Sequence, residues 1–162
     1  MKRETFCAPK SFTGEQYTVE YPIRDRRGKD FSIRIERTPT HWSFQIQTGT
    51  GATIGCLRLG VAAHVGEIEE FEVKEKCVTP ISPWLQTLLD GLRLPLPSMK
   101  CRGRGLGSLL LIYGLKVAHD SGLGEVRGRI PAERVAVRMF RNSGFSLREC
   151  AGGYTVCRSI QH

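Results

Sequence analysis

The sequence Arg102-Gly-Arg-Gly-Leu-Gly-Ser108 runs without a break into an apolar helical pattern that ends at Ser121. Its alternating glycines allow backbone N–H groups to turn toward a common point, and the first turn of a helix leaves four N–H groups without partners at the positive end of its dipole. The stretch therefore predicts a site for phosphate or pyrophosphate, to which Arg102 and Arg104 add full charges. The alternative is an ordinary glycine-rich turn with two solvated arginines.

Established nucleotide motifs do not fit this loop. A Walker loop ends in Gly-Lys-Ser/Thr, whereas here the sequence is Gly107-Ser-Leu, which disfavours hydrolysis of a nucleoside triphosphate. In the dinucleotide fingerprint a third glycine is needed where Ser108 stands, and 95–101 is a poor first strand for a doubly wound sheet. The chain also lacks the G-x-S-x-G elbow of serine hydrolases.

The composition is that of a soluble globular protein. The chain has 162 residues, 40% of them hydrophobic and 25% charged, which suits one domain with a full core. The longest apolar run, 109–113, is far too short to span a bilayer, and the N-terminus lacks an apolar signal segment. We therefore expect no membrane association. The net charge of +8 favours acidic partners such as nucleic acid, CoA-like phosphates or an acidic protein.

Cysteine and histidine spacing gives no metal motif. The 6 cysteines form no C-x-x-C pair, and none of the 4 histidines stands at zinc-ligand spacing from them. We expect no metal, reduced thiols and a cytoplasmic location.

The first half of the chain predicts an antiparallel meander. Residues 1–16 mix charge, proline and glycine without a period and predict a loosely ordered arm, so that 17–162 form the single domain. Alternation of apolar and polar residues predicts strands at 17–23, 31–37, 41–47, 53–61 and 65–74, joined by short turns. The turn Asp25-Arg-Arg-Gly-Lys29 carries arginines that either contact a polyanion or are simply solvated.

The fifth of these strands is unusually acidic. Period-2 alternation predicts that one face carries Val65, Glu67, Glu69, Phe71 and Val73, with the remaining glutamates on the other face. Burial of a carboxylate raises its pKa toward that of a useful general base. The alternative is an edge strand with exposed charges.

Four prolines bracket an insert at 77–100, in which 84–92 predicts a short amphipathic helix that ends near Gly91. We expect this helix to pack on the body of the protein, either as a lid over a cleft or as a surface insert. After the glycine loop the pattern predicts a largely buried helix to Ser121, a strand at 125–130, a helix from Pro131 and a hairpin at 145–160.

Three motifs in the expected order resemble the GNAT superfamily of acyl-CoA-dependent N-acyltransferases. Arg102-x-x-Gly105-x-Gly107 is similar to its pyrophosphate loop, Q/R-x-x-G-x-G/A. The segment 133–145 is similar to its N-x-x-A-x-x-L-Y-x-K-x-G-F helix, and 68–73 resembles the strand that leads to the loop. The resemblance covers the chain from Trp42 onward. It implies an α/β (α+β) fold with a mixed, mostly antiparallel central sheet and helices on both faces.

The resemblance also implies a cosubstrate and its ligands. Acetyl-CoA or another acyl-CoA would place its pyrophosphate on the loop, and its pantetheine would follow the backbone from Phe71 to Val73. A primary amine of a small molecule or protein would then attack the thioester directly, with Glu67 or Glu69 as the general base. The predicted cofactor residues are Phe71, Val73, Arg102, Gly103, Arg104, Gly105, Leu106, Gly107 and Ser108.

Three features depart from the family pattern. Phe140 stands where the family usually carries a tyrosine acid, and Phe cannot donate a proton. Glu133 replaces the asparagine that begins the same helix motif, and 74–101 is a much longer link than usual. A competing interpretation is therefore a catalytically weak or inactive CoA-binding or regulatory module of the same fold. It would act through a basic surface on protein or, less favoured, on nucleic acid.

Overall fold

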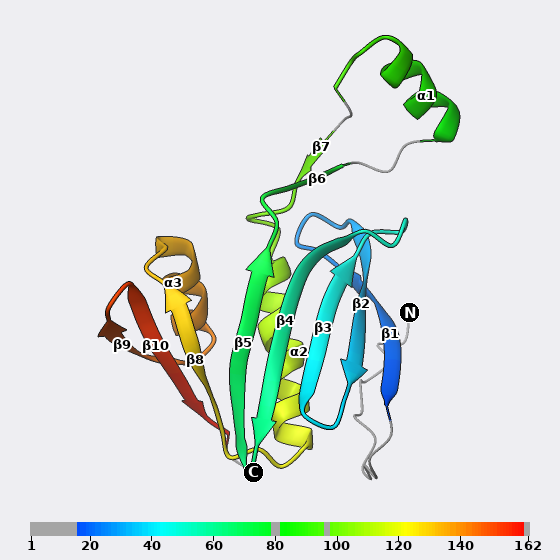
Figure 1. Cartoon of the computed structure of the whole chain (residues 1–162). Helices are drawn as coiled ribbons and strands as arrows, with labels where there is room; N and C mark the ends of the chain where they lie inside the picture. Colours follow the sequence, from blue (N-terminus) through cyan, green and yellow to red (C-terminus); the bar gives the residue numbers. More distant parts are fainter. Residues whose placement is uncertain (1–15, 79–81, 96–97, 161–162) are drawn as a thin grey trace.

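The structure is a computed structural model that describes residues 16–78, 82–95 and 98–160. Its centre is an eight-stranded sheet in the order β1-β2-β3-β4-β5-β8-β10-β9 (Figure 1). The first five strands form the predicted antiparallel meander, in the ranges β1 Tyr17–Arg24, β2 Asp30–Arg37, β3 His41–Gln47, β4 Thr53–Ala62 and β5 Val65–Val73. The predicted loose arm lies almost wholly outside the described residues.

The second half of the chain adds three strands to the sheet through one parallel pairing. β8 (Glu125–Pro131) lies parallel to β5, and β10 (Gly153–Ser159) and β9 (Ser146–Cys150) continue antiparallel. The parallel ladder is short: its last pair is Ile68 and Gly128, although both strands continue beyond it. Beyond that pair the two strands diverge, as Figure 1 shows.

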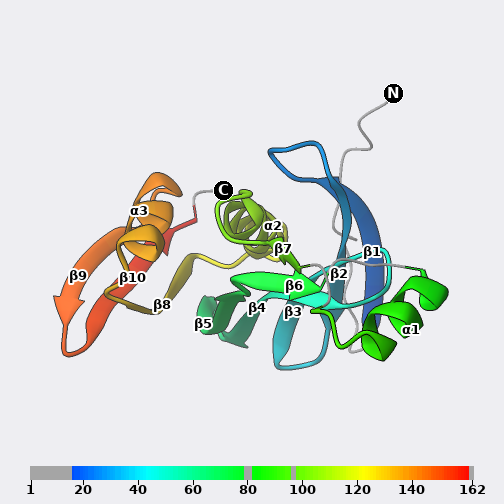
Figure 2. The same cartoon turned by 90° about the horizontal axis from the view of Figure 1, so that it is seen from above.

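The two helices that contact the sheet cover the same face. α2 (Leu106–Asp120) packs on β3, β4 and β5, and α3 (Arg134–Asn142) packs on β8 and β9. Phe140 of α3 reaches Phe71 of β5, and Figure 2 shows α2 and α3 on one side of the strands. The sheet is mixed and mostly antiparallel as predicted, but the expected helices on both faces are not found in the described residues. The reason is that the strands have only one apolar face.

That apolar face forms the core. Alternate residues of β2 and β3 are buried, among them Ile33, Ile35, Phe44 and Ile46, each 0% exposed. None of the helices in the described residues is long and apolar enough to cross a membrane.

A bulge in β5 overturns the predicted arrangement of its side chains. Arg58 pairs with Glu70 and Leu59 with Ile68, so Glu69 is an extra residue on β5. A bulge of this kind shifts the alternation by one position. Ile68, Phe71 and Val73 consequently share the α2 face, whereas Glu67 and Glu69 lie on the opposite face. The prediction that these five positions share one face was wrong because period 2 does not allow for a bulge.

The insert forms an arm rather than a layer. β6 (Lys76–Val78) and β7 (Ser98–Lys100) pair as a separate short ribbon, and α1 (Pro83–Gly91) lies at its far end, away from the sheet (Figure 1). The predicted helix is present, but it does not pack on the body: no residue of α1 is buried, and Trp84 is 68% exposed. Amphipathic spacing shows that a helix has an apolar side, not what covers that side.

Candidate functional site: the loop before α2 and the opening between β5 and β8

The loop before α2 presents a row of unused amides. Gly103 and Gly105 have φ values of +78° and +83°, in the left-handed region that favours glycine, and Gly105 is the N-cap of α2. Within the described residues, no amide N–H from Gly103 to Ser108 donates to another backbone or side-chain group, and the helix ladder begins with the Leu109 N–H. Unpaired amides at the positive end of a helix dipole form an anion site.

Gly107 has a packing role in this site. A Cβ at Gly107 would lie 2.7 Å from Met139 Sδ of α3 and 3.3 Å from Phe71 Cζ of β5. Its missing side chain therefore lets α2 lie close to β5 and α3. Leu106 is 1% exposed, so its side chain belongs to the core and only its backbone faces the loop.

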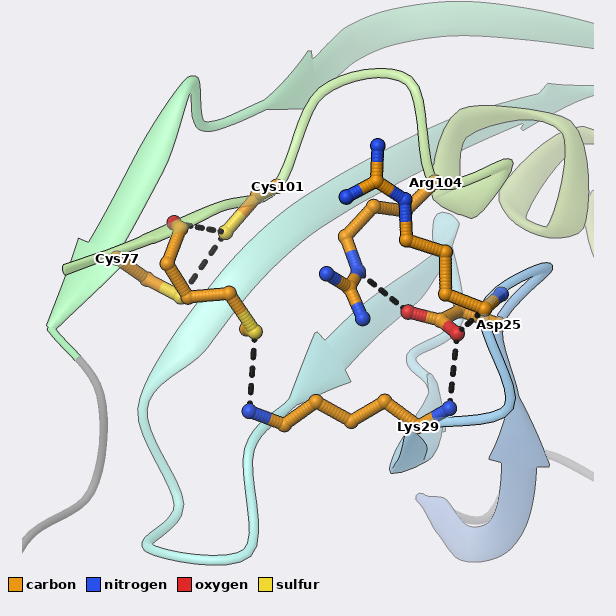
Figure 3. Close-up of polar contacts among 7 residues, drawn as sticks. Asp25, Lys29, Cys77, Cys101 and Arg104 are labelled. Atoms are coloured by element: carbon orange, nitrogen blue, oxygen red, sulfur yellow. Dashed lines mark hydrogen bonds and ion pairs between the residues drawn. The ribbon is translucent and has the colours of Figure 1, made fainter.

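Arg104 is not a free loop cation. Its guanidinium Nε donates to Asp25 Oδ2 (Figure 3). The side chains of Arg104 and Asp25 are 9% and 0% exposed. Asp25 Oδ1 also accepts the N–H groups of Arg27 at 2.8 Å and Lys29 at 2.9 Å. The pair therefore fastens the loop to the turn between β1 and β2. No local sequence signal links these residues, which are 79 positions apart.

The hydrogen bonds set the ionisation of Asp25. Burial alone would raise the pKa of its carboxyl, but the N–H of Lys29, the Arg104 guanidinium and the N–H of Arg27 together hold that pKa below its usual value. Asp25 is therefore a carboxylate at neutral pH, and it neutralises Arg104.

Arg102 is an exposed cation with a nearby acid. Its Nη1 lies 3.9 Å from Glu133 Oε2, and the two side chains are 54% and 57% exposed. A contact of this length between solvated groups is weak, so the Arg102 guanidinium remains available to an anion. Glu133 precedes α3 as its N-cap and brings a negative charge to the edge of the loop.

Arg26 lies beside the loop. From the sequence alone, the arginines of its turn could either contact a polyanion or be solvated. The backbone N–H of Arg26 donates to the Arg104 carbonyl at 3.2 Å. Its side chain lies against Gly105, since a Cβ there would meet Arg26 Nε at 2.8 Å and Cδ at 3.0 Å. The β1–β2 turn thus delivers an exposed arginine to the first turn of α2.

Two thiols lie next to the loop. Cys101 Sγ is 2.9 Å from Cys77 Sγ at the foot of the arm (Figure 3), and the Cys101 N–H donates to the Glu75 carbonyl at 2.8 Å. Burial and the hydrogen bond to Cys77 raise the pKa of Cys101 to about 12. These contacts hold the residue before Arg102 in place.

Beyond the pair Ile68 and Gly128, β5 and β8 are no longer hydrogen-bonded, and this leaves an opening between them. Phe71 of β5 connects the opening with the loop, because its ring lies beside Gly107. Residues 70–73 pair with β4 on one side, but on the β8 side the ladder has ended, so their backbone groups facing β8 have no strand partner. Glu69 is the first residue past the last parallel pair, and its carboxylate lies over Gly60, where a Cβ would meet Glu69 Oε1 at 2.3 Å. Glu67 lies within the ladder, paired with Arg127 of β8.

Phe140 is a core residue. It is 0% exposed, and its ring makes edge contacts with Phe71 and Phe145 at centroid distances of 5.3 and 5.0 Å. Other side chains that carry a hydroxyl or thiol proton come from separate elements: Tyr113 from α2, Tyr154 from β10 and Cys150 from β9. Burial raises the pKa of the Tyr113 phenol, which makes it a weaker acid.

The bulged strand also gathers a group that the sequence did not indicate. On the face opposite α2, Cys56 Sγ donates to Glu70 Oε1 at 3.3 Å, and Glu72 lies beside them. Burial, followed by the hydrogen bond and charge of Glu70, raises the pKa of Cys56 to about 11. The thiol is therefore protonated at neutral pH.

Comparison with known proteins identifies the fold. No protein-family model and no curated protein sequence matches the chain. Among solved structures, it is similar to the GNAT domain of PAT from S. lividans, with a TM-score of 0.61, 14% identity and coverage of 87% of this chain and 97% of that one. It is also similar to the ribosomal-protein-S18-alanine N-acetyltransferase of Escherichia coli, with a TM-score of 0.53, 12% identity and coverage of 78% and 73%.

A third match was solved with a ligand. The PaiA N-acetyltransferase from Thermoplasma acidophilum, in complex with coenzyme A, has a TM-score of 0.53 and 14% identity, with coverage of 75% of this chain and 62% of that chain. At these identities the likeness establishes the fold. The chain has the GNAT fold, which confirms the fold implied by the motif resemblance.

Proposed function

We propose that this protein is an N-acyltransferase that moves an acyl group, acetyl as the first expectation, from acyl-CoA to a primary amine. The observation that carries the proposal is the row of unused amides at 103–108, next to the opening between β5 and β8. Pyrophosphate is an anion of the size that such a row of N–H groups and a helix N-terminus bind. The fold is shared with a protein whose structure contains coenzyme A.

The open side of β5 suits the rest of the cosubstrate. A pantetheine arm carries amide groups, and the backbone of residues 69–73 has unpaired N–H and C=O groups on the side facing β8. Hydrogen bonds to such an arm would satisfy those groups and direct the thioester toward the end of the parallel ladder. Phe71 and Val73 act here through their backbone, because their side chains pack on the α2 face.

Glu69 is the stronger of the two candidates for the general base. Both side chains are exposed, but Glu69 follows the last parallel pair directly, whereas Glu67 is paired with Arg127 within the ladder. Glu69, through water, would take a proton from the ammonium so that the amine lone pair can attack the thioester carbonyl. The C–S bond then breaks, and its electron pair leaves with the thiolate.

The departing thiolate needs no buried acid in this scheme. Phe140 offers no proton, but a thiol of ordinary pKa near 8.5 is a good leaving group, and the thiolate is protonated by solvent. The cost of losing an acid is therefore a slower transfer, not a blocked one.

A second candidate function is a CoA-binding module without transfer activity. The buried aromatic cluster around Phe140 favours it, because the described residues hold no proton donor at that position. The two candidates share the cosubstrate site and differ only in thiol release.

Titration calorimetry with acetyl-CoA, followed by a thiol-release assay with a panel of amines, separates them. Binding with release supports the enzyme, whereas binding without release supports the module. Absence of binding contradicts both.

A proline at position 108 tests the loop amides. Ser108 lies in the first turn of α2, where proline is tolerated, so Ser108→Pro removes one N–H and keeps the helix. We expect acetyl-CoA affinity to fall about tenfold or more, since a hydrogen bond to a charged group is worth about 1.5–3 kcal/mol. The control Ser108→Ala removes only the hydroxyl and should bind as the wild type does. Equal affinities in calorimetry for both variants would contradict the amide site.

A further inference from the structure

We infer that Arg26, from the turn between β1 and β2, is the arginine that binds the pyrophosphate at the N-terminus of α2, in place of Arg104. The inference rests on the proposed function and assigns a ligand residue that the loop motif does not contain. Three arginines lie around the loop, namely Arg26, Arg102 and Arg104. They differ in whether an acidic side chain pairs with them.

Of these three, Arg26 alone has no acidic partner in the described part of the chain. Arg104 is held by Asp25 in the interior, and Arg102 has Glu133 at 3.9 Å. For Arg104 to reach an external anion it would have to leave a buried carboxylate uncompensated, which is strongly unfavourable. Arg26 is exposed and can bind a phosphate without breaking any ion pair.

The stem of Arg26 is already directed at the loop. Its Cγ, Cδ and Nε atoms occupy the space where a side chain at Gly105 would lie, at 2.8 to 3.0 Å from the ideal Cβ position. Gly105 is the N-cap of α2, and the amides next to it are unused. The guanidinium is therefore carried by a stem that rests on the same turn whose N–H groups are expected to bind the anion.

The backbone of Arg26 is fixed on both sides. Its own N–H donates to the Arg104 carbonyl, and the Asp25 carboxylate accepts the N–H groups of Arg27 and Lys29. A side chain presented by a fastened turn loses less freedom on binding than one on a loose turn. The Asp25–Arg104 pair is thus the device that positions Arg26.

The chemistry matches a pyrophosphate. A guanidinium forms two parallel N–H···O bonds to phosphate oxygens, and its charge compensates the dianion that the backbone N–H groups only partly neutralise. This also gives a reason for Gly105 beyond its positive φ, because any side chain there would displace Arg26.

The experiment is titration calorimetry of wild type, Arg26→Gln and the matched control Arg27→Gln with CoA, dephospho-CoA and pantetheine. Both arginines are exposed in the same turn, so neither change should alter the melting temperature. We expect Arg26→Gln to weaken CoA and dephospho-CoA alike, by about tenfold or more, because both carry the pyrophosphate. Arg27→Gln should change either affinity by less than about threefold, and Arg26→Lys should recover only part of the loss.

The outcomes are distinct. Wild-type binding of CoA with no effect of Arg26→Gln overturns the assignment and leaves the proposed function standing. A loss confined to CoA and absent with dephospho-CoA also overturns it, since Arg26 would then contact the 3′-phosphate. If wild type binds neither CoA nor dephospho-CoA, the proposed function fails, and the assignment fails with it. An equal loss for both nucleotides, with pantetheine unaffected, supports the assignment.

Discussion

The two ends of the candidate site are built very differently. At the loop end, a buried ion pair, a left-handed glycine and a helix–helix contact fix the backbone of residues 103–108. At the acyl end, where the β5–β8 ladder stops and the thioester is expected, the candidate base Glu69 is an exposed residue on a bulge. Phe140, at the position of the family's tyrosine acid, is an apolar core residue. The difference indicates that binding of the cosubstrate and acyl transfer depend on separate groups, so each can be removed while the other is kept.

The largest effect is expected from removing the support of the loop end. Asp25→Ala leaves the Arg104 guanidinium buried without a counter-charge, which costs about 3–5 kcal/mol of unfolding free energy. Urea denaturation measures the loss. Asp30→Ala is the matched control, because its pair with Arg24 is solvated, with side chains 60% and 72% exposed, and should cost less than about 1 kcal/mol. Equal costs for the two variants would show that the buried pair does not hold the loop.

At the acyl end, Glu69→Gln should lower the turnover number by about a hundredfold or more, because general bases contribute 10²–10⁴-fold. Acetyl-CoA affinity and unfolding free energy should stay at the wild-type level, since Glu69 is exposed. Glu72→Gln on the same strand is the control, with no effect on turnover expected. Steady-state kinetics with the best amine decides, and unchanged turnover in Glu69→Gln would remove this residue from the proposed mechanism.

Acid should weaken the loop end through Asp25. The pKa of Asp25 is lowered in the folded state, so in acid the unfolded chain binds more protons than the folded one. The stability that Asp25 contributes is full above its ordinary pKa near 3.9 and is lost as pH falls through the lower folded value. Urea melts between pH 2 and 7 should show this slope in wild type and a flatter one in Asp25→Asn. Parallel curves for the two proteins would contradict the assignment.

The smallest effect concerns the thiols beside the loop. We expect oxidised glutathione to convert Cys77 and Cys101 to a disulfide, giving two glutathione thiols, because their sulfur atoms lie 2.9 Å apart. The reaction should be slow at neutral pH and faster as pH rises, since the pKa of Cys101 is raised to about 12. Peptide mass mapping identifies the bond, and Cys101→Ser is the control. A mixed disulfide at Cys77 in the wild type, with Cys101 still a thiol, would count against this geometry.

The alternation of apolar and polar residues, together with the glycine-rich run, predicted much of the fold. The alternating segments 31–37 and 41–47 became β2 and β3, and the glycine-rich run became the loop and helix α2. The single apolar face of these strands also made a meander the natural arrangement, because neighbouring strands can then share one core. Local signals of this kind act within a few residues, so they are visible in one sequence.

Such local signals could not predict which charged residues pair with each other. Asp25 and Arg104 both lie in polar, turn-forming stretches, and only the packing of the β1–β2 turn on the loop buries them together. The bulge at Glu69 likewise arises from the pairing of β4 with β5, and it places Glu67 and Glu69 on the face opposite Phe71.

By itself, therefore, the sequence determined where the glycine loop lies, which helix it begins and which strand precedes the insert. The tertiary structure decided which arginine remains free to bind an anion. The physical reason is that an arginine's charge acts outward only when no buried carboxylate compensates it. Burial of Arg104 and exposure of Arg26 follow from contacts between segments far apart in the chain.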